Sequence, residues 1–189
     1  MPLGIEAPNS RFQDTLLEPP VADDAVEQAL SNSDHAPVLL HPGSHGSAGN
    51  WAPERFAVLA RELVHSGMNV AFTGTAQEGR DFAPHFPDVD GVSSWFGRFS
   101  LHQLLAAQSR SKAVVASSTG PLHTATALGI PGVGLYGKSA PAWAARWAPI
   151  GPQVAVIKTD SMDDQGHLDI SVDQVKAAVL AFTSPAPST

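Results

Sequence analysis

The chain has 189 residues, 43% hydrophobic and 15% charged, which is typical of one globular domain and unlike a disordered chain. Its net charge is −7 with His neutral, and its 11 Lys and Arg residues are too few for a surface that neutralises nucleic-acid phosphates. There is no cysteine, which excludes disulfides, thiolate catalysis and cysteine-based zinc sites.

Membrane and targeting signals are also missing from the sequence. No run of about 18 apolar residues is present, and the N-terminus lacks the charged-then-apolar pattern of a signal peptide. We therefore expect a cytoplasmic protein without a transmembrane segment, for which a peripheral contact with a membrane stays open.

The first 36 residues are expected to form a strap or an interdomain linker. Residues 1–20 carry four prolines and little periodicity, whereas residues 21–30 have apolar side chains at helical spacing. We expect the main, Rossmann-like nucleotide-sugar-binding domain over residues 37–183. Residues 184–189 are expected to be a frayed tail.

Short apolar runs alternate with helical patterns through the main domain. Strands are expected at residues 38–40, 69–73, 89–92, 112–116, 132–136 and 154–158. Helices are expected at residues 53–65, 80–85, 101–106, 121–128 and 172–182, the third capped by Ser100 and the last by Ser171. This alternation predicts the α/β class: a Rossmann-like, doubly wound, mostly parallel sheet of about six strands with helices on both faces.

Four loops rich in glycine and hydroxyl residues follow predicted strands, at residues 41–50, 74–79, 117–123 and 137–141. The carboxyl ends of parallel strands share one edge of the sheet, and ligands bind along that edge. We therefore expect these loops to form one binding site. The first loop has neither the G-x-G-x-x-G dinucleotide fingerprint nor the Gly-Lys-Ser/Thr ending of a P-loop.

The third of these loops has the composition of a helix N-terminus that binds an anion. Its sequence is Ser117-Ser118-Thr119-Gly120-Pro121-Leu122-His123. Thr119 or Gly120 can cap the helix, and Pro121 suits the first helical position, where an N–H has no intrahelical partner. Unpaired N–H groups and the helix dipole then face three hydroxyls, which favours a phosphate. An ordinary capped corner explains the same residues.

Histidines and tryptophans are weaker candidates for chemistry. His41, His45 and His123 show no metal-ligand spacing, so we expect core or surface roles for them and no metal. Trp143 and Trp147 are four residues apart, as on one helix face. Packing is the usual role of such a pair, and stacking on a sugar or a base is the less common one.

Several blocks of the sequence have a distinctive order and spacing. They are His41-Pro42-Gly43-Ser44 with Asn50-Trp51-x-Pro53-Glu54-x-Phe56, then Phe72-Thr73-Gly74, then Ser118-Thr119-Gly120-Pro121-Leu122-His123-x-Ala125-x-Ala127-Leu128-Gly129-Ile130-Pro131, then Gly134-Leu135-Tyr136-Gly137. Across residues 37–150 this pattern resembles the C-terminal half of the heptosyltransferases of glycosyltransferase family nine. The resemblance implies the GT-B arrangement of two Rossmann-like halves, in which the C-terminal half holds the nucleotide-sugar donor.

The resemblance also implies which residues contact an ADP-heptose-like donor, with no cofactor and no metal. The implied phosphate-side residues are Ser44, Ser118, Thr119, Gly120, Pro121, Leu122 and His123. The implied nucleoside-side residues are Thr73, Gly74, Gln77 and Glu78.

Two residues depart from the family pattern. Gly49 stands where the family commonly has a lysine, and Ser118 stands where it often has an aspartate. The family's N-terminal half, which binds the acceptor and carries the proposed catalytic acid, has no counterpart in this sequence. We therefore assign no catalytic residue and expect the chain to bind a donor but to transfer no sugar unaided. A separate N-terminal half or a homo-oligomer is the expected partner.

Two other functions stay open. A degenerate, non-catalytic binding or scaffold module that acts through protein–protein contacts is favoured by Gly49 and Ser118. A complete small enzyme, such as a nucleotide-sugar hydrolase, is disfavoured because no compact acid–base set is visible: Asp81, Asp88 and Asp90 lie on a different loop.

Overall fold

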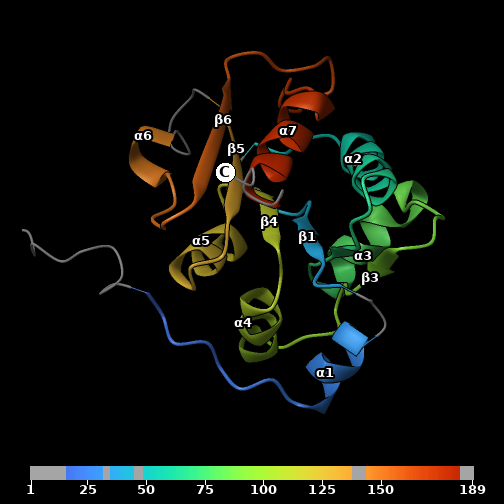
Figure 1. The fold of residues 1–189 in the computed structure, drawn as a ribbon. Helices are drawn as coiled ribbons and strands as arrows, with labels where there is room; N and C mark the ends of the chain where they lie inside the picture. The colour runs from blue at the N-terminus through green and yellow to red at the C-terminus, as the bar shows by residue number, and fades with distance from the viewer. Residues whose placement is uncertain (1–15, 32–34, 45–48, 138–143, 184–189) are drawn as a thin grey trace, which may run out of the picture.

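The computed structural model describes residues 16–31, 35–44, 49–137 and 144–183 (Figure 1). Six strands form one sheet in the order β3-β2-β1-β4-β5-β6, and every neighbouring pair is parallel. The strands are β1 (Val38–His41), β2 (Val70–Phe72), β3 (Val92–Ser94), β4 (Ala113–Ser117), β5 (Gly132–Gly137) and β6 (Val154–Thr159). This is the doubly wound order of Rossmann folds, so the predicted fold class is confirmed.

Helices cover both faces of the sheet (Figure 1). They are α1 (Asp24–Ser31), α2 (Pro53–His65), α3 (Ala76–Phe82), the 3₁₀ helix η2 (Ala83–His85), α4 (Leu101–Ser109), α5 (Gly120–Ala127), α6 (Ala144–Trp147) and α7 (Val172–Thr183). Helices α2 and α7 pack with β1, β4 and β5 into one core, while α1 and α4 pack with Ala125 of α5 into a second core on the opposite face. Strands β1, β2 and β4 are buried at every position, which explains why they read as unbroken apolar runs.

One predicted loop is wrong. The turn expected at residues 74–79 contains the first turns of α3, so this helix begins at Ala76 and not at residue 80. Thr75 and Glu78 form a capping box that starts the helix, a stronger signal than the two glycines beside it. Gly79 lies inside this helix, and the position requires a glycine because a Cβ there would come within 2.6 Å of the Cβ of Phe96.

The third strand is also displaced from its predicted position. It was expected at residues 89–92 and lies at Val92–Ser94. Gly91 has a φ of 88°, so the chain turns just before the strand begins.

Some predictions fall on residues outside the described ranges. These are His45, Trp143, most of the 137–141 loop, the first 15 residues and the tail at residues 184–189. Within the ranges that the structure describes, no helix is long and apolar enough to cross a membrane.

Candidate functional site

The chain reverses its winding direction between β1 and β4. These two strands are neighbours in the middle of the sheet, and from them the chain proceeds to β2 and β3 on one side and to β5 and β6 on the other. His41 pairs in register with Ala116, so the loops that begin at Pro42 and Ser118 leave the sheet close to each other. The crevice at such a reversal is the usual ligand position in open α/β sheets.

Helix α5 opens onto this crevice. Thr119 is the N-cap residue, with an extended φ of −131° and ψ of 165°, so Gly120 is the first helical residue and Pro121 the second. The Thr119 carbonyl accepts a hydrogen bond from the N–H of Leu122 at 3.1 Å, but the Thr119 side chain does not cap the helix. A Cβ built on Gly120 meets no atom of the described chain within 4 Å. The space beside Gly120, at the start of the helix, is therefore open.

Two hydroxyl groups at this end of β4 are buried and have no hydrogen-bond partner among the described residues. Ser117, the last residue of β4, is 1% exposed and Thr119 is 7% exposed. Leaving such a group unpaired costs about 1–3 kcal/mol, and most buried polar groups do have a partner. The end of β4 is therefore a place where a polar partner is missing.

Other predicted phosphate-side residues lie elsewhere. The Ser118 side chain hydrogen-bonds Tyr136 of β5, whose pKa is raised by burial although that bond lowers it. Leu122 is fully buried and packs in a core cluster with Ala116 and Tyr136. His123 lines a separate hollow with Trp147, between α5 and α6, and burial lowers the His123 pKa. Gly120 thus borders open space, whereas the side chains of Ser118, Leu122 and His123 contact other parts of the protein.

Two cavities flank the side chain of Glu78. One has a volume of about 290 Å³, and its lining includes Pro42, Gly43, Ser44, Asn50, Gln77 and Asp81. The other has a volume of about 280 Å³, and its lining includes His41, Thr73, Gly74, Trp95, Phe99 and Pro121. The structure therefore brings together Ser44, Gln77 and Glu78 at one cavity, and Thr73, Gly74, Glu78 and Pro121 at the other.

The Glu78 carboxylate is held in place between these cavities. Its Oε2 accepts hydrogen bonds from the N–H of Thr75 at 2.7 Å and from the Thr75 hydroxyl at 3.0 Å. Its Oε1 lies against Gly43, where a built Cβ would come within 1.7 Å of that oxygen. A side chain at position 43 would force the Glu78 carboxylate out of this position.

Thr73 joins the ends of two strands and does not present a free hydroxyl. The residue is 2% exposed, and its Oγ1 lies 3.1 Å from Nδ1 of His41. This bond fixes the floor of the second cavity at the ends of β1 and β2.

Neither cavity is lined by a lysine or an arginine of the described chain, and two carboxylates, Glu78 and Asp81, line the first. Gly49 provides no cation here, and a Cβ built on it would lie 3.1 Å from Cδ2 of Leu168. An anion in this site would depend on the N–H groups and hydroxyls around α5.

Sequence reasoning missed the aromatic wall of the second cavity. Trp95 and Phe99 contact each other edge to face, with ring centroids 5.4 Å apart. The sequence signal for this wall is the aromatic segment Trp95-Phe96-Gly97-Arg98-Phe99, which directly follows β3. Because the sequence predicts that the strand ends at residue 92, it does not place this segment at the carboxyl end of the strand. Sequence reasoning also missed the contacts of Arg55, which depend on residues more than a hundred positions away.

Comparisons with known proteins agree with this architecture. The model of glycosyltransferase family 9 (heptosyltransferase) matches residues 3–170. Lipopolysaccharide heptosyltransferase 2 of Salmonella typhimurium is 30% identical over 138 residues, which are 67% of this chain and 40% of that protein. The four matched curated relatives are covered over 34–44% of their length, so the chain spans less than half of each.

Solved structures show the same fold. ADP-heptose lps heptosyltransferase II of E. coli superposes with a TM-score of 0.70 at 24% identity, over 89% of this chain and 53% of that one. The E. coli heptosyltransferase WaaC with ADP superposes with a TM-score of 0.63 at 18% identity, over 82% of this chain and 48% of that one.

Proposed function

The chain belongs to glycosyltransferase family 9, the heptosyltransferase family, and we propose that it is the donor-binding half of a heptosyltransferase-like glycosyltransferase. In this proposal an ADP-heptose-like nucleotide-sugar binds in the crevice between the carboxyl ends of β1 and β4. The structure of a relative with ADP supports adenine as the base.

The observation that carries the proposal is the N-terminus of α5. Its first residue, Gly120, faces open space, and the hydroxyl of the cap residue Thr119 is buried without a partner in the described chain. A diphosphate oxygen in front of the helix would accept hydrogen bonds from N–H groups, and from this hydroxyl once the Thr119 side chain rotates toward the ligand. The helix dipole favours its negative charge. The binding energy of the anion would thus offset the cost of the buried hydroxyl.

Glu78 and the second cavity suit the nucleoside. Glu78 is a fixed carboxylate in the first turn of α3, the helix that follows β2, and Rossmann folds use an acidic residue to accept a hydrogen bond from a ribose hydroxyl. The cavity on one side of Glu78 has the aromatic side chains of Trp95 and Phe99 in its wall, which suit the faces of a base. We place the base in this second cavity and the ribose at Glu78.

Sugar transfer requires more than a bound donor. The departing diphosphate must be stabilised, and a base must take the proton of the acceptor hydroxyl. The first task fits α5, whereas no described carboxylate or histidine is assigned the second. We therefore propose that transfer needs a separate acceptor-binding half, as the family resemblance implies.

A non-catalytic binding module is the second candidate. One observation favours it: the described lining of the two cavities contains no lysine or arginine, and it includes the carboxylates of Glu78 and Asp81. A diphosphate would meet a site with little positive charge, and in such a module the crevice would bind no nucleotide.

Calorimetric titration of the chain with ADP at low salt, with UDP and GDP as controls, separates the two candidates. We expect ADP to bind and Gly120→Val to abolish binding, because the new side chain would fill the space in front of α5. Gly120→Ala is the matched control: it adds one methyl group and removes a flexible glycine from the helix, so it should raise stability and weaken binding less. Binding of none of the nucleotides, or equal ADP affinity in Gly120→Val, would contradict the proposal.

A further inference from the structure

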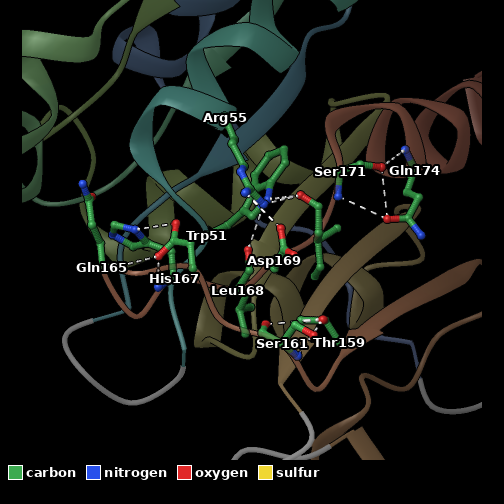
Figure 2. A network of polar contacts seen from close by, with 12 residues as sticks. Trp51, Arg55, Thr159, Ser161, Gln165, His167, Leu168, Asp169, Ser171 and Gln174 are labelled. Carbon is green, nitrogen blue, oxygen red and sulfur yellow. Dashed lines mark hydrogen bonds and ion pairs between the residues drawn. The ribbon is translucent and has the colours of Figure 1, made fainter.

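The segment after β6 is bound to the start of α2 by side-chain hydrogen bonds (Figure 2). Nη1 of Arg55 donates to the carbonyl oxygens of Leu168 at 3.2 Å and Ile170 at 2.8 Å. Nη2 of the same guanidinium pairs with Oδ1 of Asp169 at 3.0 Å. The indole N–H of Trp51 donates to the Ile170 carbonyl at 2.8 Å. Arg55 of α2 and Trp51, which precedes the helix, thus hold three consecutive residues of a distant segment.

These bonds extend to the wall of the first cavity. The N–H of Leu168 donates to the carbonyl oxygen of Asn50 at 2.8 Å, and Asn50 lines the cavity beside Glu78. Leu168 is fully buried, and its side chain fills the space that a Cβ on Gly49 would enter. The position of Asn50 therefore depends on the position of Leu168.

The hydrogen bonds from Arg55 to the two carbonyl oxygens contribute more to this arrangement than its ion pair with Asp169 does. The Asp169 side chain is 55% exposed, so solvent screens the attraction between the two charges. The two carbonyl oxygens lie nearer the buried core, where Leu168 and Ile170 are 0% and 1% exposed. A planar guanidinium can donate to several acceptors at once, which is what this geometry uses.

We propose that Arg55 is a positioning residue for the donor site. By holding the carbonyl groups of Leu168 and Ile170, it fixes Asn50 at the wall of the first cavity, in the position that receives the donor. The inference rests on the proposed function, since it assigns Arg55 to the same site. Without Arg55, Asn50 must become ordered when the ligand binds, and that ordering lowers affinity.

The test compares variants of two arginines on one helix. Arg55→Gln removes the bonds to the carbonyl groups, whereas Arg61→Gln removes the same charge from an exposed position of α2 that makes no side-chain bond in the described chain. We expect Arg55→Gln to weaken ADP binding about tenfold, because the ordering of Asn50 is added to the cost of binding. We expect Arg61→Gln to change it less than about twofold.

Two further variants separate the contacts of Arg55. Asp169→Asn should leave ADP affinity within about twofold of wild type, because the exposed ion pair is screened. Arg55→Lys keeps the charge and one donor group, so it should recover part of the affinity, and it replaces Arg55→Gln if that variant does not fold. Equal affinities in the Arg55 and Arg61 variants would overturn the inference.

Hydrogen exchange provides a readout that does not depend on nucleotide binding. The amide hydrogen of Leu168, which is bonded to Asn50, should exchange faster in Arg55→Gln than in Arg61→Gln or wild type. If wild type binds no ADP, the proposed function fails, and this exchange rate then decides whether Arg55 holds the contact between Leu168 and Asn50. Unchanged exchange would overturn the positioning role in either case.

Discussion

Replacing Thr119 by Val gives a sharp prediction because the two side chains have nearly the same shape. The backbone of Thr119 is extended, with φ −131° and ψ 165°, and the side chain makes no capping bond, so a β-branched apolar residue fits without loss. The substitution removes a buried hydroxyl that has no partner in the described chain. Because such a group costs about 1–3 kcal/mol, we expect the free energy of unfolding to rise by about 1 kcal/mol.

The same substitution should weaken donor binding. A hydroxyl that donates to a charged phosphate oxygen contributes about 1.5–3 kcal/mol. Its loss would weaken ADP affinity by roughly tenfold to a hundredfold. Thermal melting without ligand and calorimetric titration with ADP measure the two effects, and a gain of 1 kcal/mol should raise the melting temperature by about 2–4 °C.

Thr126→Val is the matched control. Thr126 lies in the same helix and is fully buried, but its hydroxyl donates to the carbonyl oxygens of Leu122 at 3.2 Å and His123 at 3.1 Å. Its loss should lower stability by about 0.5–1.5 kcal/mol and leave ADP affinity unchanged. Our reasoning is refuted if Thr119→Val lowers the melting temperature and leaves ADP affinity intact, since the hydroxyl would then be partnered within the protein and lie outside the site.

The remaining predictions concern Glu78 and His123. Glu78→Gln should weaken ADP binding about tenfold, by removing a charged acceptor, and leave the weaker binding of 2′,3′-dideoxy-ADP unchanged; an equal loss for both ligands by calorimetry would argue against a ribose contact. Burial lowers the pKa of His123 below its ordinary value of 6.5, so the unfolded chain binds a proton at His123 more tightly than the folded chain does. The stability that neutral His123 contributes above pH 6.5 is therefore lost as the pH falls toward the folded-state pKa. The melting temperature of wild type should therefore fall more between about pH 7 and about pH 5 than that of His123→Gln, and equal slopes would contradict the burial argument.

The elements with strong local signals could be predicted from the sequence. Helix α2 occupies residues 53–65 as expected, because Pro53 suits a helix start, apolar residues repeat at helical spacing, and Gly67 follows its end. The four central strands are apolar runs between glycine-rich loops. Because both faces of these strands are buried, their sequences are mostly apolar and do not alternate between polar and apolar residues. The helix start at Thr119 could also be predicted from the sequence, because a capping residue is followed by a proline in the first turn.

The weaker local signals misled the prediction. Glycines at positions 74 and 79 suggested a turn, although the capping box between Thr75 and Glu78 starts a helix there. Gly79 is required by the Phe96 side chain, a contact from another element that no local pattern contains.

The sequence by itself determined the α/β class, the position of most elements and the family motifs around Thr119 and Gly120. Only the tertiary structure decided the strand order, and with it that the β1 and β4 loops meet at the reversal of the sheet. It also decided that Leu122 packs into the core, that the Thr119 hydroxyl has no partner in the described chain, and that Arg55 binds residues 168–170. The physical reason is range: propensity, capping and periodicity act over a few neighbouring residues, whereas a side chain's burial and its hydrogen-bond partner depend on which distant segments the sheet brings together.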